Sequence, residues 1–598
     1  MSAENPNSMG DFLQQTLASC SNSIKNGDFK QSDEYISELV TFLDSISDTK
    51  DELEYENLAF EALSQIYHYL ISPSLDQAVT DELAFELPKA VAKLACASAR
   101  CFENAERIID RFVETCSPRD MVSILCEAMV SPSDGFSNSY FTPLFGALAK
   151  VFEALQRRTF EQVKAALPVV LKALEVTLSD PEDEDTGLLN LLNKAILIAH
   201  SLKAVCQKMD HKDEKLVALF SLYVLQIMAL ISNSLGAETS KCFPMTSQLS
   251  HLLQYCGLSY LGLITGHEVD TTIDLLSQGD EVDYINCFSY VRSGAVLTVL
   301  WKDFSCEVAD ATKEDLDAVK DELRSDQMKR WQAVGMLKHT FASVNLPWAL
   351  KRHAIDFLFC IMEGVDCHQN NDETMEHSEY MPTLYAALQA IQLVIVYASD
   401  PLLRKRAFDT FKMVLADLSP SLRFDILMAL IRNSELSSMI AILLGLVKDE
   451  MFKEYPQKVS KEIGDAKQEN DTFKHSSPFW TVSVLDCVEF VLKPPKGGPP
   501  CLPEFTDAVL SALNLYRFIL ITESSGNTNY TEVLSKINLQ KVYREWLEPL
   551  RALVSSVAVE NHKDNDQLAF DAVCALNPVE FVLYRCIELV EENLKHRT

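Results

Sequence analysis

The chain has 598 residues, of which 47% are hydrophobic and 23% charged, and its formal net charge is −33 at pH 7. A chain of this length can bury a large core and exceeds one compact domain, so we expect several domains or one extended array. The excess of acid disfavours nucleic acid and membrane surfaces as partners, because both are polyanions and would be repelled at long range. Its 18 glycines and 22 prolines fall below ordinary usage, which disfavours a β-sandwich or a disordered chain.

Three features of the sequence predict the cellular compartment of the protein. The opening residues, MSAENPNSMGDFLQQTL, lack a basic segment followed by an apolar one, so no secretory signal is expected. The longest apolar run, residues 216–231, is interrupted by Gln226 and falls short of the roughly 20 residues that span a bilayer, so it predicts a core helix. The 16 cysteines are scattered through apolar helical runs, which predicts reduced, mostly buried thiols. Together these features predict a protein of the cytoplasm and nucleus.

Helical periodicity dominates the chain from its start. Residues 1–10 are expected to form a flexible N-terminus. Beyond them, apolar residues recur with a period of about 3.6, and helices separated by short turns follow one another. Two such pairs are residues 56–70 with 81–97, and residues 140–155 with 159–178. No segment shows the alternation of a strand, so the sequence predicts an all-α fold.

One hairpin indicates the type of helical repeat. Residues 381–415 place Pro382 near the start of one helix, and Asp400, Arg404 and Ala407 around the start of the next. This layout is typical of HEAT hairpins, in which a small alanine permits close helix crossing while the Asp and Arg tie turns together. We therefore predict a HEAT-like (armadillo-like) helical-repeat solenoid, in which each hairpin buries its apolar face by stacking on its neighbours.

The predicted organisation has two regions. N-terminal helical repeats are expected over residues 11–320, and C-terminal HEAT-like repeats, the expected partner-binding region, over residues 321–598. Polar composition marks the long connections, which should be exposed because they can bury little apolar surface. There are four of them: residues 179–187, 363–380, 455–478 and 493–503.

Motifs for catalysis or metal binding are weak. Gly257, Ser259 and Gly262 resemble a nucleophile elbow, but the spacing is one residue too long and no strand precedes them, so a helix is predicted there. A zinc site would have to use four residues in mid-chain: Cys360, Cys367, His368 and His377. Their spacing is too wide for two tight ligand pairs. No phosphate-binding glycine loop or dinucleotide fingerprint is present. We predict no catalytic residue, cofactor, metal or small-molecule substrate.

A small basic island interrupts the acidic chain. Its cations are opposed by only three aspartates between residues 403 and 427: Arg404, Lys405, Arg406, Lys412 and Arg423 against Asp409, Asp417 and Asp425. Arg404 is expected mainly to brace its hairpin. Lys405 and Arg406 flank it on a helix whose next two residues turn inward, so at least one should project into solvent. Without further information, the residues predict an acidic helical solenoid that binds proteins.

Longer stretches resemble a known family. The C-terminal half resembles the glomulin family in four segments, in the same order and at similar spacing: residues 403–418 (LRKRAFDTFKMVLADL), 477–492 (SPFWTVSVLDCVEFVL), 512–521 (ALNLYRFILI) and 545–554 (EWLEPLRALV). Over its whole length the chain resembles the plant branch of that family, the aberrant root formation protein family. Three further segments carry this likeness: residues 72–91, 118–129 and 222–232.

The resemblance implies a non-enzymatic inhibitor built from HEAT-like repeats. Its C-terminal region would bind the RING-box subunit of cullin-RING ubiquitin ligases and cover the surface where the ubiquitin-charged conjugating enzyme docks. The plant branch also implies a role in root development. Exposed aromatic and arginine side chains dominate such interfaces. The partner-binding candidates are therefore Arg404, Lys405, Arg406, Arg423, Trp480, Arg517, Trp546 and Arg551. For the two tryptophans, a place in the core is an equal alternative.

A second function fits the same fold. A HEAT-repeat scaffold or transport adaptor could bind peptide cargo along a concave face, and the acidic charge would suit basic cargo. That function calls for a row of Asp, Glu and Trp at the repeat spacing. The tryptophans keep no common period: Trp301, Trp331, Trp348, Trp480 and Trp546.

Overall fold

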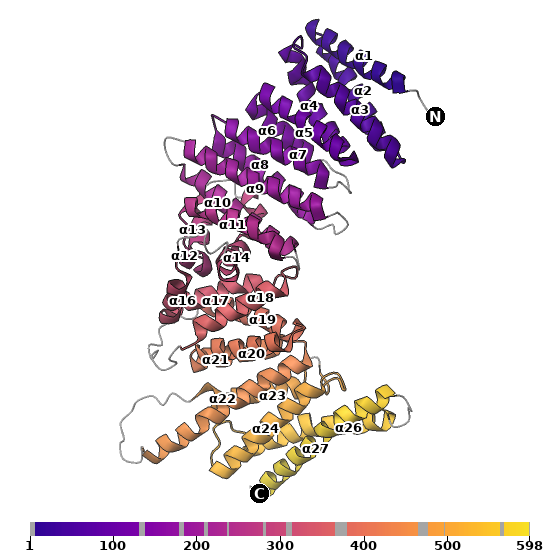
Figure 1. The fold of residues 1–598 in the computed structure, drawn as a ribbon. Helices are drawn as coiled ribbons and strands as arrows, with labels where there is room; N and C mark the ends of the chain where they lie inside the picture. The colour runs from indigo at the N-terminus through magenta and orange to yellow at the C-terminus, as the bar shows by residue number, and fades with distance from the viewer. Residues whose placement is uncertain are drawn as a thin grey trace. The chain divides into compact units, whose positions relative to one another are not determined.

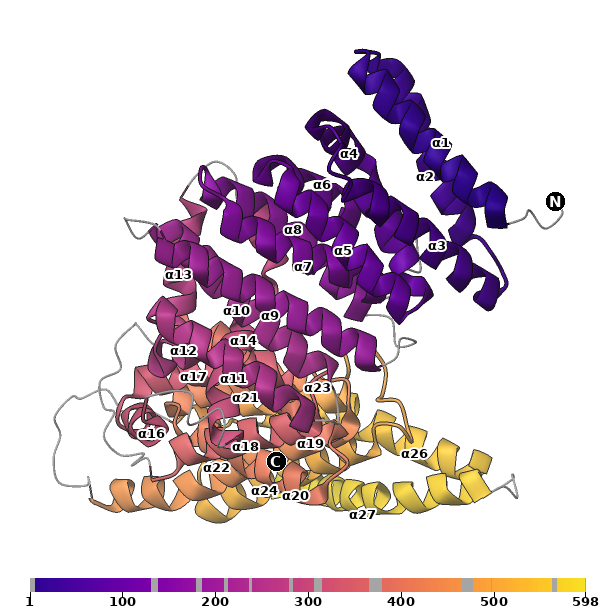
Figure 2. The ribbon, with the colours of Figure 1, turned by 45° about the horizontal axis from the view of Figure 1, so that its top comes forward.

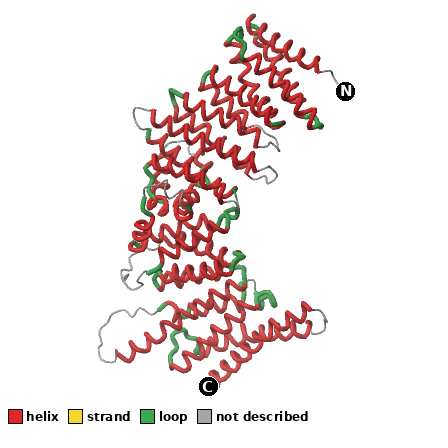
Figure 3. Tube along the Cα trace, viewed as in Figure 1, coloured by secondary structure: helices red, strands yellow, loops and turns green. Residues whose placement is uncertain are grey.

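The computed structural model describes most of the chain: residues 6–130, 138–178, 185–208, 213–235, 239–278, 283–305, 314–364, 379–464, 477–495, 497–561 and 567–596. These residues form α-helices, short 3-10 segments and one π-helical turn, with no strand among them (Figure 3). The all-α prediction is confirmed. Residues 1–5 lie outside the described residues, whereas residues 6–10 of the expected flexible N-terminus begin a helix. Most of the expected polar connections 179–187 and 363–380 also lie outside the described residues. Of the connection expected over residues 455–478, residues 465–476 lie outside them, but residues 455–464 are helical, so the prediction of a loop there is wrong.

Two compact units make up the chain. Unit 1 is Met1–Phe357 and unit 2 is Leu358–Thr598. The division falls inside α18 (Trp348–Met362), C-terminal to the boundary that we expected after residue 320.

Unit 1 is a succession of helices that pack on near neighbours in the sequence (Figure 1 and Figure 2). Before α18 they are α1 (Pro6–Lys25), α2 (Phe29–Ser47), α3 (Glu52–Leu70), α4 (Gln77–Leu94), α5 (Ala99–Thr115), α6 (Pro118–Val130), α7 (Asn138–Ala154), α8 (Thr159–Leu178), α9 (Asp185–Lys208), α10 (Glu214–Ser234), α11 (Thr239–Cys256), α12 (Tyr260–Thr265), α13 (His267–Ser277), α14 (Val291–Phe304), α16 (Leu316–Ser325) and α17 (Gln327–Phe341). Helix α1 packs on α2, α3 on α5, α7 on α9, and α10 on α14. Each helix thus buries its apolar face on its neighbours, as in a HEAT-like solenoid.

Helix α10 lies in the core of unit 1. Every residue from Leu216 to Ser232 is buried, which confirms the predicted core helix. Gly294 of α14 crosses α10 so closely that a Cβ atom there would lie 1.8 Å from the carbonyl oxygen of Leu225. Helix α10 and residues 187–208 of α9 are long and apolar enough to cross a membrane, but 94% of the apolar window of α10 is buried inside the fold.

Unit 2 continues the same pattern of stacked helices. After α18 they are α19 (Met381–Tyr397), α20 (Pro401–Ala416), α21 (Pro420–Asn433), α22 (Ser437–Gly464), α23 (Ser483–Leu492), α24 (Thr506–Gly526), α25 (Lys536–Val542), a π-helical turn (Tyr543–Leu547), α26 (Glu548–Asn561) and α27 (Gln567–His596). Helix α19 packs on α20, α22 on α24, and α24 on α27. The HEAT-like prediction therefore holds in each unit.

Local capping explains where many of these helices begin. Asp400 accepts a hydrogen bond from the backbone NH of Leu402, and Pro401 occupies the first position of α20, where its missing NH costs nothing. Ser419 caps α21 in the same way, with Pro420 first. The hairpin predicted over residues 381–415 is thus present as α19 and α20.

Candidate protein-binding surface

Arg404 braces the α19–α20 hairpin, as expected. It is the fourth residue of α20, and its Nη1 donates to the carbonyl oxygens of Ala398 at 2.8 Å and Ser399 at 3.2 Å. Both carbonyls follow the end of α19, where the chain has no further helical NH groups to bond them. The guanidinium therefore caps one helix from the start of the next.

Arg423 has the same role in the next hairpin. It is the fourth residue of α21, and it donates to the carbonyl oxygens of Leu415 at 2.8 Å, Ala416 at 3.0 Å and Leu418 at 2.9 Å. It also pairs with Glu450 of α22, and the two side chains are only 16% and 14% exposed. We expected Arg423 to be available to a partner, but it is a bracing residue inside unit 2, because four acceptors already surround its guanidinium.

A third arginine, in unit 1, braces its hairpin in the same way and was not predicted from the sequence. Arg330 is the fourth residue of α17, and its Nη1 donates to the carbonyl oxygens of Leu323 at 3.1 Å and Arg324 at 2.8 Å, at the end of α16. The signal is a repeated Ser-Asp-x-x-x-Arg spacing at residues 325–330 and 399–404. In both cases the Asp caps the new helix and the Arg caps the old one.

The remaining island cations differ in their surroundings. The guanidinium carbon of Arg406 lies 3.3 Å from the centroid of the Phe359 ring, so this arginine stacks on α18. Lys412 pairs with Asp409 at 2.9 Å. Lys405 is exposed, and within the described residues it forms no hydrogen bond, ion pair or ring contact. Lys405 is the island residue that best fits the predicted surface role.

Two exposed side chains at the turn between α19 and α20 were not predicted. Tyr397, the last residue of α19, is 63% exposed, and Leu402, one helical turn before Lys405, is 73% exposed. We call Tyr397, Leu402 and Lys405 the α19–α20 tip. Leu402 lies outside the apolar stripe of α20, so its position relative to Leu403, Ala407 and Phe411 was the available signal.

Both candidate tryptophans belong to the core. Trp480 is 1% exposed and its Nε1 donates to the carbonyl oxygen of Met451 at 3.0 Å. Trp546 is 2% exposed on the π-helical turn, with its ring 6.0 Å from that of Tyr516. Neither ring is available as a surface anchor.

The last two candidates are not joined to the tip by any contact among the described residues. Arg517 is half-buried on α24, and Arg551 is exposed on α26. Their place in a binding surface stays a prediction.

The elbow-like segment is a helix start. Ser259 caps α12: its Oγ accepts from the backbone NH of Gly262 at 3.0 Å and donates to Glu268 at 2.8 Å. Glu268 also accepts from the backbone NH of Ser259 at 2.7 Å. A groove of about 390 Å³ lies beside Ser259, but these bonds commit the hydroxyl to capping. The predicted helix is present from Tyr260 on, whereas residues 257–259 form the turn and the cap that precede it.

None of the cysteines in the described residues is joined in a disulfide. Burial raises the pKa of Cys126 and of Cys487 to about 12, so neither is a thiolate at neutral pH. Of the zinc candidates, Cys360 is half-buried, while Cys367, His368 and His377 lie outside the described residues. In the placed segments of the chain, no three His, Cys, Asp or Glu residues are grouped to hold a metal ion.

Comparison with known proteins assigns the family. The chain is 44% identical to Aberrant root formation protein 4 of Arabidopsis thaliana, over 98% of this chain and 92% of that protein. Among solved structures, importin β matches with a TM-score of 0.24 and 11% identity, covering 98% of this chain and 68% of importin β. A Kap121p mutant matches with a TM-score of 0.19 and 12% identity, covering 99% of this chain and 70% of Kap121p. At these scores the superpositions carry no argument.

The family model described as YAP/Alf4/glomulin matches residues 17–340 and 352–586, and so extends over most of both units. The chain therefore belongs to the YAP/Alf4/glomulin family.

Proposed function

We propose that this protein is a non-enzymatic inhibitor of cullin-RING ubiquitin ligases. In this proposal unit 2 binds the RING-box subunit and covers the surface where the ubiquitin-conjugating enzyme docks, in the cytoplasm and nucleus. Membership of the glomulin family supports it, because the family match extends through most of unit 2 and the inhibitor role is what the resemblance to glomulin implies.

The observation that carries the proposal is the α19–α20 tip. Leu402 exposes apolar surface one helical turn from Lys405, a cation with no partner among the described residues, and Tyr397 exposes its ring at the end of the preceding helix. An aromatic or aliphatic anchor next to a charge that the partner can neutralise is the usual composition of an interface hot spot. The positive sign of Lys405 also runs against the chain's net charge of −33, so the tip would select an acidic patch on its partner.

The adaptor alternative receives no such support from the tryptophans. Trp301, Trp331, Trp480 and Trp546 are all buried, so they cannot form a row on a concave face. Trp348 is 40% exposed, with the ammonium group of Lys351 4.7 Å from its ring.

The test measures RING-box binding and ubiquitin-chain synthesis by a neddylated cullin-RING ligase, with the full-length chain added. We expect the wild-type chain to bind and to slow synthesis. The double variant Leu402→Ser with Lys405→Glu should weaken binding about tenfold or more, since it removes one anchor and reverses one charge.

A matched control lies elsewhere on unit 2. Lys536 and Ile537 of α25 are also exposed, Ile537 by 79%, and Lys536→Glu with Ile537→Ser makes the same chemical change. This control should bind as the wild type does. If the wild-type chain neither binds nor slows ubiquitin transfer, the inhibitor proposal is wrong. If the control loses binding and the tip variant does not, the contact lies at α25.

A further inference from the structure

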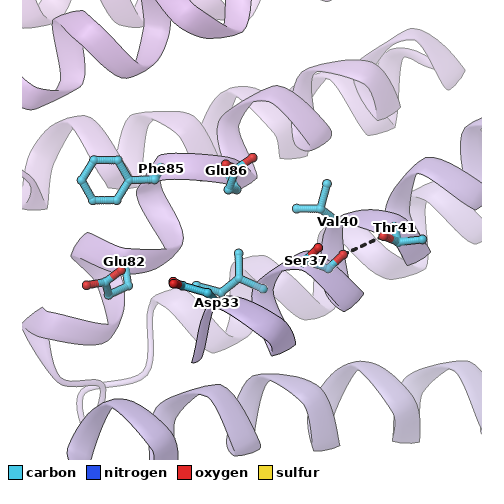
Figure 4. Close-up of a pocket in the computed structure, with 8 residues that line it drawn as sticks. Asp33, Ser37, Val40, Thr41, Glu82, Phe85 and Glu86 are labelled. Carbon is cyan, nitrogen blue, oxygen red and sulfur yellow. Dashed lines mark hydrogen bonds between the residues drawn. The ribbon is translucent and has the colours of Figure 1, made fainter. Parts of the chain in front are cut away.

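Unit 1 contains a groove between α2 and α4, which has no role in the proposed RING contact of unit 2. Its volume is about 440 Å³, within the roughly 300–1,000 Å³ of most ligand sites. It is lined by Asp33, Ile36, Ser37, Val40 and Thr41 from α2 and by Glu82, Phe85 and Glu86 from α4 (Figure 4). The two helices pack directly on each other, so the groove follows their line of contact.

Each helix turns one face toward this groove. On α2 the apolar positions Ile36 and Val40 are one helical turn apart, as are Glu82 and Phe85 on α4. Ile36 is buried and forms part of the floor, whereas Phe85 is 59% exposed. A phenyl ring exposed to this degree inside a groove offers apolar surface to an incoming side chain.

Three carboxylates surround this apolar surface. Asp33, Glu82 and Glu86 form no hydrogen bond or ion pair within the described residues. Asp33 and Glu82 approach from opposite helices (Figure 4). Both Asp33 and Glu82 lie close enough to the Cys20 thiol to affect its pKa. Burial raises this pKa most, a hydrogen bond with Ser32 lowers it, and the charges of Glu82 and Asp33 raise it further.

We propose that this groove binds a short basic segment of another protein. An apolar side chain of the segment packs on Phe85 and Ile36, and flanking Lys or Arg residues pair with Asp33, Glu82 and Glu86. Charge complementarity selects this occupant, because three unpaired carboxylates in a chain of net charge −33 attract cations. The apolar lining adds the burial of apolar surface, which a purely ionic contact would lack. The site lies in unit 1 and is independent of the proposed RING contact.

The first experiment identifies the preferred chemistry without assuming a sequence. A random peptide library displayed on phage is selected against the immobilised full-length chain. We expect enriched peptides to combine Lys or Arg with a large apolar residue. Enrichment of acidic peptides, or of apolar peptides without basic residues, would overturn the proposal.

The second experiment places the binding in the groove. The most enriched peptide is synthesised with a fluorescent label, and its affinity is measured by anisotropy at low and high salt. The triple variant Asp33→Asn, Glu82→Gln, Glu86→Gln should bind about tenfold more weakly and with less salt dependence, as expected for three solvent-exposed ion pairs. Phe85→Ser should also weaken binding but should leave the salt dependence unchanged.

The control keeps the net charge of the triple variant. Glu34 and Glu38 on α2 and Glu103 on α5 are exposed and do not line the groove. Replacing all three with Gln should leave affinity within about twofold of the wild type, because long-range charge alone is a small term at high salt. Equal weakening by both triple variants, or no effect of Phe85→Ser, would show only general attraction to an acidic protein. Circular dichroism checks that each variant keeps its helices.

Discussion

The α2–α4 groove of unit 1 and the α19–α20 tip of unit 2 both combine exposed apolar side chains with charges, but of opposite sign. In the groove, Asp33, Glu82 and Glu86 have no hydrogen-bond or ion-pair partner among the described residues. In the basic island, Arg404 and Arg423 are bound by backbone carbonyls, and only the tip's Lys405 stands without a partner in the described segments of the chain. A run of like charges in a sequence therefore does not measure the charge of a surface.

Position along a helix explains the difference. The fourth residue of a helix that follows a tight turn lies next to the carbonyls that end the previous helix, and an arginine there donates to them. Arg330, Arg404 and Arg423 all occupy this position. The groove carboxylates are the fifth residue of α2 (Asp33) and the sixth and tenth residues of α4 (Glu82 and Glu86), and a carboxylate cannot donate to the carbonyl oxygens of a preceding helix.

The largest expected effect comes from comparing a buried and an exposed phenylalanine of unit 2. Phe411 is 1% exposed on α20, whereas Phe452 is 68% exposed on α22. Phe411→Asp should lower the free energy of unfolding by about 4 kcal/mol, because it buries an unpaired charge and leaves a cavity. Phe452→Asp should change it by less than about 0.5 kcal/mol. Urea denaturation followed by circular dichroism compares them, and equal effects would contradict the assignment of the core.

Two glycines should give effects of opposite sign in the two units. Gly294→Ala in unit 1 should destabilise by about 3 kcal/mol, because its Cβ would lie 1.8 Å from the Leu225 carbonyl oxygen. Gly445 lies inside α22, and a Cβ atom added there would meet nothing within 4 Å, so Gly445→Ala should stabilise unit 2 by about 0.5 kcal/mol. The shifts in thermal midpoint measure both. A neutral Gly294→Ala would mean that α10 and α14 do not cross closely.

The bracing arginines can be separated from the surface lysine by truncation. Arg423→Ala should cost about 2 kcal/mol, because it leaves three carbonyls without their charged donor and removes one of the two cations that pair with Glu450. Lys405→Ala should cost less than about 0.5 kcal/mol. Denaturant midpoints distinguish the two, and a costly Lys405→Ala would show that the lysine is also a brace.

The smallest expected effect is a pH dependence at Glu450. Burial alone would raise the pKa of its carboxyl, but hydrogen bonds and charges from Lys453 and Arg423 lower it below the ordinary 4.5. A carboxyl whose pKa is lower in the folded chain than in the unfolded chain stabilises the fold when it is ionised. This stabilisation is complete above the ordinary pKa of 4.5 and is lost as the pH falls through the lower pKa of the folded chain. The stability gap between wild type and Arg423→Ala should therefore narrow below pH 4.5. A constant gap would exclude this coupling.

Local chemistry in the sequence determined the helical fold. The period of the apolar residues predicted helices throughout, and the Asp400 cap followed by Pro401 predicted the α19–α20 hairpin at its observed position. The apolar run within α10 predicted a core helix for the same reason, since length and composition alone decide whether a segment can be buried all round. Around Ser259 the sequence predicted a helix rather than a catalytic turn, but the prediction did not identify Ser259 as the residue that caps its start.

Tertiary structure decided which side chains are available. Trp480 lies against Met451 of α22 and Phe518 of α24, and Trp546 lies against Tyr516 of α24, so residue type alone could not tell core from anchor. Arg423 is engaged because Glu450 is brought to it from the next helix. The groove depends most on the fold. Nothing in the sequence indicates that residues 33–41 and 82–86 lie together, and they meet only because α4 packs directly on α2, although α3 separates the two helices in the sequence.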